Sequence, residues 1–358
     1  MQHKFIFCRL FHWGIQKRPE TVFLIYKVKK ILGFEKVKSM TNIKDLAKMA
    51  GVSVTTVSRV LNNHPYVSKE KRNAVLAAIK ESNYEQNINA VHLSKGKTQM
   101  IGVVLPFSDH PYFALLLKGI AKQALENNYK LVLFQTDYME SRELEALQML
   151  KQKQIDSLII CSRTCEWSVI QEYLSYGTIV LCEDTKGKEV SSTFVNQYKI
   201  FKEALAFLHK KGHQKIGYCI GRKTGPSSQL RANAYQEFLL EHQLPYCEEY
   251  IIDHCNYFED AKKVMDHLLQ MDNPPSALIV TSDQVAAGIV IYCQKQGIKI
   301  PEELAIIGYH NESIARLMEI STMEIPLLEM GKNLFQQAIS KEITKKEMFF
   351  RFIERTTV

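Results

Sequence analysis

The sequence predicts a small helical head, a short linker and an α/β body built on parallel sheets. Between residues 43 and 79, apolar residues recur at helical spacing, and a glycine and two serines separate the runs. From Met100 onward, short continuous apolar runs alternate with amphipathic stretches, a pattern typical of buried parallel strands joined by helices. The 358 residues are enough for such a head and a body of two lobes.

The head is expected to hold three helices. Gly51 ends the first, because glycine enters the left-handed region without strain. Ser53 is the expected N-cap of the second helix and Ser68 that of the third. Two short helices joined across a glycine turn make a helix-turn-helix. The residues expected to form its core are Ile43, Leu46, Ala47, Ala50, Val57, Val60, Leu61, Val75, Ala78 and Ile79.

The second helix leaves an outer face of Val54, Thr55, Ser58 and Arg59. A recognition helix lies in the major groove of DNA, where its side chains reach base edges. Arg59 is the expected specific contact, since a bidentate arginine–guanine pair contributes about 1–3 kcal/mol of discrimination. Thr55 lies one turn away, and Val54 offers an apolar surface to a thymine methyl group. The alternative is that Arg59 is only a solvated surface residue.

The block from Thr41 to Tyr84 resembles the DNA-binding head of the LacI/GalR (lactose-repressor) family of bacterial transcription regulators. The matching stretches are Ile-Lys-Asp-Leu-Ala at 43–47, Ala-Gly-Val-Ser at 50–53, Thr-Val-Ser-Arg-Val-Leu-Asn at 56–62 and Tyr-Val-Ser at 66–68. A match over three helices and their turns is far more specific than a lone helix-turn-helix pattern. By resemblance, the residues that hold the DNA backbone would be Ser53, Thr56, Ser58, Asn62, Tyr84 and Asn87. Tyr84 has an alternative role in packing the third helix.

Residues 40–86 are thus the expected DNA-binding domain, and residues 87–99 are the expected hinge. The resemblance implies that this hinge becomes helical when two copies pair on operator DNA, and that Leu93 wedges into the minor groove. Asn87, Ala90, Leu93 and Thr98 match the family pattern. Val91 stands where basic residues are common and Gln86 where proline is usual, and these two departures slightly weaken the expected hinge behaviour.

The body, residues 100–358, is expected to hold two lobes, 100–195 with 324–345, and 196–323. Stretches at 210–216 and 307–309 also resemble family landmarks, so the resemblance covers about residues 41–345 and implies a periplasmic-binding-protein-like body that closes on a ligand. The expected strands are 101–105, 131–134, 157–160, 179–181, 216–220, 250–252, 277–280 and 304–307. The expected helices are 112–127, 140–153, 197–211, 229–242, 259–270 and 284–296.

Ligands of open α/β sheets bind beyond the carboxyl ends of the strands. The loops there supply eight candidate effector-binding residues: Tyr112, Phe113, Asp137, Arg163, Arg231, Asn256, Ser282 and His310. In the family, an arginine matching Arg231 and an aspartate grip a sugar or a purine, on which an aromatic residue stacks. Here His310 replaces that aspartate and Asn256 replaces the aromatic residue.

These departures favour an anionic effector. An imidazole cannot accept from two hydroxyls as a carboxylate does, whereas Arg231 beside a protonated His310 would hold a sugar phosphate or acid. Two alternatives stay open. His310 could be a neutral loop histidine, and the missing carboxylate could come from Asp137 or Asp283, which both lie near the expected cleft.

Charge is distributed unevenly along the chain. Residues 1–39 carry a net charge of +7, residues 40–100 carry +5, and residues 101–358 carry −4. A basic head with an acidic body suits a protein that contacts phosphates with one end. Residues 1–39 show no periodicity and no signal-peptide core. We expect a non-native or disordered extension there, with the native chain starting at Met40; the alternative is a basic arm that adds phosphate contacts.

Several classes of protein are not supported by the sequence. The eight cysteines lie partly inside apolar runs and are expected to be reduced. No metal site or cofactor is expected, because only Cys161 and Cys165 lie close together and no Cys or His partners follow at ligand spacing. No stretch approaches the roughly 20 apolar residues of a membrane span. The sequence contains no glycine-rich phosphate loop and no Gly-x-Ser-x-Gly elbow, so it gives no indication of an enzyme.

The sequence therefore predicts a cytoplasmic, homodimeric transcription regulator, with repression the expected mode. Two heads would hold a pseudo-palindromic double-stranded operator, because paired half-sites need paired heads. The body would sense a small carbohydrate-related effector, and a phosphoprotein corepressor is left open. The alternatives are a solute-binding or sensor protein with the same body, and a nonspecific architectural DNA binder whose affinity depends on salt but not on sequence.

Overall fold

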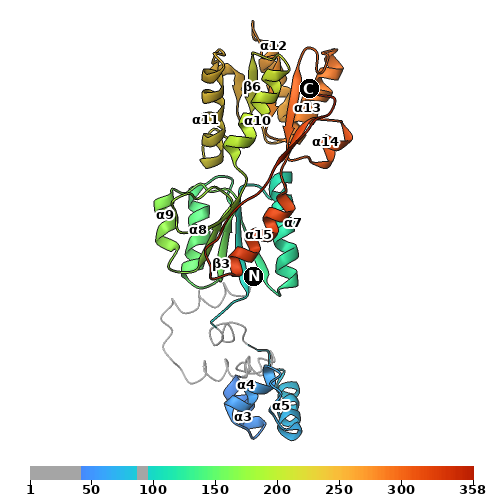
Figure 1. Ribbon diagram of the computed structural model, residues 1–358. Coiled ribbons are helices and arrows are strands. Elements are labelled where there is room, and N and C mark those ends of the chain that lie inside the picture. The colour runs from blue at the N-terminus through green and yellow to red at the C-terminus, as the bar shows by residue number, and fades with distance from the viewer. Residues whose placement is uncertain (1–41, 87–95) are drawn as a thin grey trace, which may run out of the picture. The chain divides into compact units, whose positions relative to one another are not determined.

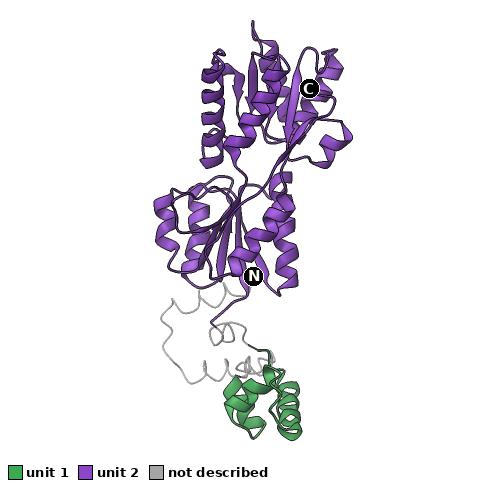
Figure 2. Ribbon diagram, viewed as in Figure 1, with its two compact units in different colours: residues 1–91 green, residues 92–358 purple. Residues whose placement is uncertain are grey.

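The computed structural model describes residues 42–86 and 96–358, which belong to two compact units (Figures 1 and 2). The first unit is the helical head. The second is an α/β body of two lobes. None of the helices within these ranges is long and apolar enough to cross a membrane.

The head consists of α3 (Ile43–Met49), α4 (Val54–Leu61) and α5 (Lys69–Ser82). A side chain caps the start of each helix. Asn42 Oδ1 accepts from the amides of Lys44 and Asp45, and the Asp45 carboxylate accepts from the Asn42 amide. Ser53 and Ser68 accept from the amide three residues ahead, as the sequence predicts. Caps of this kind fix where a helix begins.

The core of the head confirms the predicted inward face. Gly51 follows α3 with φ of 63°, the left-handed conformation expected of it. Tyr84, beyond the end of α5, also packs on this core. The six buried residues are Leu46, Ala47, Val57, Val60, Val75 and Ala78. The partly buried residues packed around them include Ile43, Ala50, Leu61 and Ile79.

The first lobe of the body is an all-parallel six-stranded sheet in the order β11-β5-β4-β3-β1-β2. Its strands are β1 (Met100–Leu105), β2 (Lys130–Gln135), β3 (Ser157–Ile160), β4 (Thr178–Leu181), β5 (Ser191–Phe194) and β11 (Lys345–Glu347). One face packs against α7 (Pro111–Glu126) and α15 (Leu327–Ile339), and the other against α8 (Glu140–Lys151) and α9 (Trp167–Tyr173) (Figure 1).

Two glycines allow α7 and α15 to pack closely. A Cβ on Gly119 would lie 2.2 Å from the Leu328 carbonyl oxygen, and one on Gly331 would lie 2.2 Å from that of Leu116. No side chain fits at either position without moving a helix backbone. This contact anchors α15, which comes from the far end of the chain, to the first lobe.

The second lobe holds a six-stranded sheet in the order β12-β10-β9-β8-β6-β7, in which only β12 runs antiparallel to its neighbour. Its strands are β6 (Ile216–Cys219), β7 (Ile251–Ile252), β8 (Ala277–Val280), β9 (Ala305–Tyr309), β10 (Thr322–Glu324) and β12 (Arg351–Ile353). Helices α10 (Gln197–Lys210) and α11 (Pro226–Glu241) cover one face, and α12 (Asp260–Leu269) and α13 (Asp283–Gln296) cover the other (Figure 1). A 3-10 turn (Glu248–Tyr250) precedes β7, and the short α14 (Ser313–Leu317) precedes β10.

The chain passes between the lobes three times, after β5, after β10 and after β11. The alternating strands and helices confirm the predicted fold class. The sequence did not predict β5, β10, β11, β12, α14 or α15. Those strands are only three or four residues long and lack continuous apolar runs, and β11 is composed of charged, exposed residues. The structure places α15 and β11 in the first lobe and returns residues 351–358 to the second.

Candidate functional site

The predicted outer face of α4 is largely exposed. Val54, Thr55 and Arg59 are exposed, with Val54 41 % accessible, while Val57 and Val60 on the opposite side are buried. The Arg59 side chain makes no hydrogen bond or ion pair to any described residue. Its guanidinium is therefore available to an external partner, as a base-reading arginine requires.

The other head residues expected at the DNA backbone already have local partners. Ser53 Oγ accepts from the Thr56 amide at 3.2 Å and lies 3.0 Å from Thr56 Oγ1. At the other end of α4, Asn62 Nδ2 donates to the Ser58 carbonyl at 2.8 Å. These groups therefore shape α4, and their contact with phosphates stays a prediction. Asn87, Ala90 and Leu93 lie outside the described residues.

The head also displays an exposed aromatic residue that was not among the predicted DNA contacts. Tyr66 is 84 % accessible in the loop after α4. Arg72 holds this loop by donating to the His64 carbonyl at 2.6 Å and to Asn63 Oδ1 at 3.3 Å. A large aromatic side chain displayed on a fixed loop is a candidate for contact with the partner of α4. The Tyr-Val-Ser stretch at 66–68 was the available signal.

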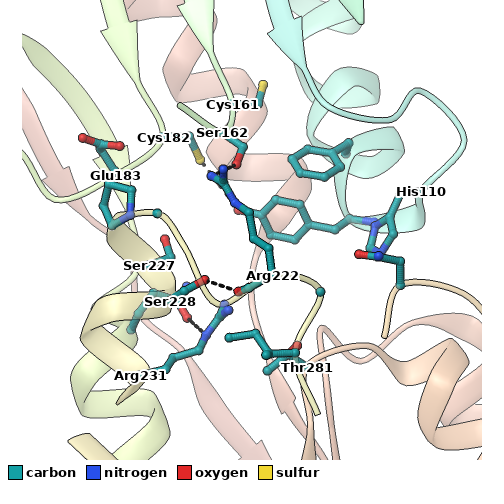
Figure 3. Close-up of a pocket in the computed structure, with 18 of the residues that line it drawn as sticks. His110, Cys161, Ser162, Cys182, Glu183, Arg222, Ser227, Ser228, Arg231 and Thr281 are labelled. Carbon is teal, nitrogen blue, oxygen red and sulfur yellow. Dashed lines mark hydrogen bonds between the residues drawn. The ribbon is translucent and has the colours of Figure 1, made fainter. Parts of the chain in front are cut away.

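In the body, a cavity lies between the two lobes and contains about 800 Å³ of space, including its open mouth (Figure 3). Small-molecule sites are commonly found where two lobes or domains meet. Both lobes contribute to its walls. The structure brings six of the eight predicted effector residues to it: Tyr112, Phe113, Arg163, Arg231, Asn256 and His310.

Two predicted residues do not line the cavity. Asp137 is exposed and accepts from Gln135 Nε2 at 3.0 Å, while its neighbour Tyr138 lines the wall. Ser282 is buried as the N-cap of α13, and its neighbour Thr281 lines the wall instead. At both strand ends the sequence placement was wrong by one residue, and adjacent side chains point in different directions.

Asp283, the other alternative carboxylate, is also absent from the wall. It is fully buried and accepts from Thr322 Oγ1 and the Glu312 amide, each at 2.8 Å. Burial raises the pKa of Asp283 to about 8, although these hydrogen bonds oppose the shift. Asp283 therefore joins α13 to the loop after β9 and does not face a ligand.

Arg231 on α11 points into the cavity with most of its donors unused (Figure 3). Its Nε donates to Gln197 Oε1 at 3.0 Å, and its Cζ lies 5.6 Å from the centre of the Tyr309 ring. Its two terminal nitrogens form no hydrogen bond with any described residue. One hydrogen bond and one aromatic contact thus orient the guanidinium toward a ligand.

His310 departs from the protonated ring expected from the sequence. It is 7 % accessible, and its ring centre lies 4.9 Å from that of Tyr112. Burial lowers the pKa of His310 and the Arg231 charge adds to this effect, whereas Glu312, 3.6 Å from Nδ1, opposes it. Burial likewise lowers the pKa of His110 to about 4. Both imidazoles are therefore neutral at neutral pH, and the positive charge of the cavity must come from arginines.

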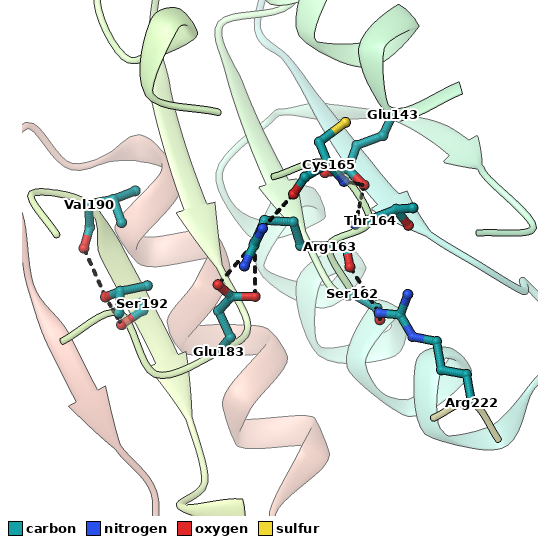
Figure 4. Close-up of polar contacts among 10 residues, drawn as sticks. Glu143, Ser162, Arg163, Thr164, Cys165, Glu183, Val190, Ser192 and Arg222 are labelled. Carbon is teal, nitrogen blue, oxygen red and sulfur yellow. Dashed lines mark hydrogen bonds and ion pairs between the residues drawn. The ribbon is translucent and has the colours of Figure 1, made fainter. Parts of the chain in front are cut away.

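Arg163 lines the cavity, but a carboxylate partner neutralises its charge. Its Nε lies 3.1 Å from Glu183 Oε1, and both side chains are less than 10 % accessible (Figure 4). The fully buried Glu143 accepts from the amides of Thr164 at 2.6 Å and Cys165 at 3.3 Å. Burial raises the pKa of Glu143, an effect that these two amides oppose. The turn after β3 is thus held by two buried carboxylates, so Arg163 has a structural task.

A second cavity arginine was not predicted from the sequence: Arg222, in the loop after β6. Its Cζ lies 3.9 Å from the centre of the Tyr138 ring, and Nη2 donates to Ser162 Oγ at 3.1 Å and to the Arg163 carbonyl at 2.9 Å. Arg222 has no carboxylate partner among the described residues. Its position just beyond a strand end was the signal that could have found it. Arg222 and Arg231 together give the cavity a net positive charge.

Two family models match the chain. The model described as "Bacterial regulatory proteins, lacI family" matches residues 42–87. The model described as "Periplasmic binding proteins and sugar binding domain of LacI family" matches residues 98–348. The head and the body thus match the corresponding two parts of one family.

Curated relatives agree with these matches. The HTH-type transcriptional regulator YkvZ of Bacillus subtilis is 41 % identical over 323 residues, which cover 89 % of this chain and all of that protein. The catabolite control protein B of the same organism is 36 % identical over 85 % of this chain and 96 % of its own length. Both are far more similar than chance allows over nearly complete sequences.

Solved structures share the fold. A complex of the transcriptional regulator CelR with cellobiose has a TM-score of 0.63 and 20 % identity, covering 89 % of this chain and all of that chain. A LacI-family regulator of Lactobacillus casei with bound sucrose has a TM-score of 0.67 and 21 % identity, covering 72 % of this chain and 99 % of that chain. From the family matches and the curated relatives it follows that this chain belongs to the LacI family of DNA-binding bacterial transcription regulators.

Proposed function

We propose that this protein is a homodimeric repressor that binds a pseudo-palindromic double-stranded operator, and that a small anionic carbohydrate-related molecule controls it from the cavity between the lobes. A sugar phosphate or a sugar acid is the class of effector that fits best. The observation that carries the effector class is the pair of arginines, Arg222 and Arg231, which face the cavity without a carboxylate partner among the described residues.

Operator recognition is assigned to α4. Arg59 and Thr55 stand one turn apart on its exposed face, beside the apolar Val54. A head of this size covers one half-site, so two copies of the chain are needed for a palindrome. Relatives named transcriptional repressor PurR, 28–29 % identical to this chain, support repression as the mode.

The anionic class follows from charge balance. Arg163 is paired with Glu183, and burial keeps His110 and His310 neutral, so no other cation in the wall competes for an anion. A charge-assisted hydrogen bond is about twice as strong as a neutral one, and an arginine binds carboxylate or phosphate through two parallel bonds. An anionic group on the effector would therefore find its strongest contacts at Arg231.

A neutral sugar is the second candidate. Hydroxyl and amide groups of Ser162, Ser227, Thr281 and Asn256 line the same cavity and suit sugar hydroxyls. Solved structures that share the fold carry bound glucose, sucrose or cellobiose. This candidate would give Arg231 the lesser task of donating to a hydroxyl.

The two candidates are separated by a thermal-shift screen of the full chain. Matched ligands are glucose, glucose 6-phosphate and gluconate, followed by the corresponding series of other sugars. We expect an anionic member to raise the melting temperature and its neutral partner to have little effect. Arg231→Ala should abolish the shift, and Arg231→Lys should retain part of it because the charge remains.

The matched control is Lys223→Ala, which removes an exposed cation from the same region without touching the cavity wall. Hits are then added to operator DNA with wild-type protein, where a change in operator affinity identifies an effector. Stabilisation by neutral sugars only, with Arg231→Ala unaltered, would reject the anionic class. Binding of random DNA as tightly as any operator would reject the regulatory assignment of the head.

A further inference from the structure

The side chain of Arg222 reaches from the second lobe to the first. Its backbone belongs to the second lobe, in the loop between β6 and α11. Its guanidinium carbon lies over the ring of Tyr138 of the first lobe, 3.9 Å from the ring centre. The guanidinium also donates hydrogen bonds to Ser162 Oγ and the Arg163 carbonyl (Figure 4). One side chain therefore makes a cation–π contact and two hydrogen bonds across the cavity.

The first lobe holds these acceptors in place without any contribution from Arg222. Glu143 on α8 binds the amides of Thr164 and Cys165, and the Arg163 side chain pairs with Glu183 and donates to the Cys165 carbonyl (Figure 4). The turn that presents the Ser162 hydroxyl and the Arg163 carbonyl is thus fixed from behind by buried charges. Its two oxygen atoms are therefore held in position to accept hydrogen bonds from a donor on the other lobe.

The second lobe likewise shapes the loop that carries Arg222. Ser228 Oγ donates to the Arg222 carbonyl at 2.8 Å. Gly225 has φ of 100°, and a Cβ at this position would lie 2.7 Å from Arg222 Nη2. A side chain at residue 225 would therefore be strained and would also displace the guanidinium. The donor and the acceptors of the contact are thus each held in position by their own lobe.

A second hydrogen bond between the lobes gives a standard for comparison. Tyr257 of the second lobe donates to Asp109 Oδ1 of the first at 2.9 Å, and this contact is solvent-exposed. Water competes for exposed hydrogen bonds, so a single one adds little. The partly buried Arg222 guanidinium combines a cation–π contact with two charge-assisted bonds, and is the stronger connection.

We propose that Arg222 is a latch that holds the two lobes together without any effector. The inference concerns the regulation of the effector cavity proposed above, but the contact itself needs no ligand. An effector would then enter a body whose lobes are already connected. The remaining donors of Arg222, which have no partner among the described residues, would be fixed in position by the first lobe.

Hydrogen exchange on the ligand-free full chain tests the latch. Arg222→Ala removes the guanidinium from the second lobe, and we expect several-fold faster amide exchange at 137–139 and 162–165 in the first lobe. Tyr138→Ala removes the platform from the first lobe, and we expect faster exchange at 221–228 in the second. The double variant should exchange no faster than the more affected single variant, because both changes break one contact.

Matched variants separate a latch from general loosening. Tyr138→Phe keeps the aromatic ring and should exchange nearly as wild type. Arg222→Lys keeps the charge but loses the planar stack, and should lie between wild type and Arg222→Ala. Lys223→Ala, which changes an exposed cation next to Arg222, should leave the first lobe unaltered.

The result that would overturn the latch is faster exchange confined to the lobe that carries each substitution. Because no ligand is present, this failure would leave the anionic effector intact. Conversely, a failed search for an anionic effector would not remove a reciprocal exchange effect between the lobes.

Discussion

The outer face of α4 and the cavity between the lobes use arginine in opposite ways. Arg59 projects from α4 without a partner among the described residues, whereas Arg163, Arg222 and Arg231 are each oriented by hydrogen bonds to neighbours. A side chain without internal partners can change without cost to the fold. Substitutions on the exposed face of α4 should therefore change DNA binding without changing stability. Substitutions of the cavity arginines should change both ligand binding and stability.

The largest expected effect lies in the cavity wall. Arg163→Met leaves Glu183 buried without a partner, which typically costs about 3–5 kcal/mol. The double variant Arg163→Met, Glu183→Leu removes both charges and should recover most of this loss. Urea unfolding of the body measures both values.

An exposed ion pair provides the control for this experiment. Lys199→Ala breaks the contact with Glu347, in which both side chains are largely accessible, and should cost at most about 1 kcal/mol. Equal losses in the single and double variants would show that the Arg163–Glu183 charges do not depend on each other.

Arg59→Ala should give the next largest effect, on DNA and not on stability. Discrimination between operator and random DNA should fall by about 1–3 kcal/mol if Arg59 contacts a guanine. Unfolding should change by no more than about 0.5 kcal/mol, as at other exposed surface sites. Fluorescence anisotropy with operator and scrambled duplexes at one salt concentration gives the ratio.

Thr55→Ala, on the same face, should reduce that ratio less than Arg59→Ala does. Unaltered specificity in Arg59→Ala would mean that α4 presents another face to DNA.

Ser53 should be an exception on α4, where a substitution changes both stability and DNA binding. It caps the helix and is also a predicted phosphate contact. Ser53→Ala should lower stability by about 1 kcal/mol and weaken operator binding. Ser53→Asp keeps a good cap but places a carboxylate beside the predicted phosphate, so stability should hold while operator affinity falls. Thermal unfolding and operator titration of the two variants distinguish the roles. Normal operator affinity in Ser53→Asp would remove Ser53 from the DNA contact.

The smallest effect concerns a single proton on His310. Burial lowers its pKa in the folded state below the ordinary value of about 6.5, so the unfolded chain binds more protons in acid. The contribution of His310 to the stability of the folded protein is therefore complete above about pH 6.5. It is lost as the pH falls below that value. His310→Asn, which tolerates the positive φ of 94°, should reduce the loss of stability between pH 7.5 and 5.5.

Thermal unfolding of both proteins at the two pH values measures this difference. An identical pH dependence would show that His310 does not titrate in that range. Binding of an anionic effector should also be nearly independent of pH from 6.5 to 8, because arginines and not His310 supply the charge.

How much the sequence could predict depends on the distance over which residues act. The caps Ser53 and Ser68, the turn at Gly51 and the apolar stripes of the head act over a few residues, and all were predicted. The cavity could be located because parallel strands end at one edge. Its polar pairs could not, since Arg163 and Glu183 lie 20 residues apart and Arg222 and Ser162 lie 60 residues apart. The first contact depends on how the strands of one lobe are ordered, and the second on how the two lobes meet.

The direction of the side chains at strand ends could not be predicted from the sequence, for a related reason. Tyr138 and Thr281 line the cavity where Asp137 and Ser282 were predicted, because a shift of one residue turns a neighbouring side chain away. The charged β11 was missed because an edge strand exposed to water needs no apolar residues. Both features follow from the assembled sheet and not from a local pattern.

The three passages between the lobes have a consequence for synthesis. Neither lobe is a continuous length of chain, so neither can be completed when the first 320 residues have left the ribosome. The first sheet gains β11 only at Glu347, and Thr357 donates to the Ile306 carbonyl at 2.7 Å and accepts from the Ser321 amide at 2.9 Å. A nascent chain must therefore keep the exposed edges of β5 and β10 from pairing with other chains until β11 and β12 have been made.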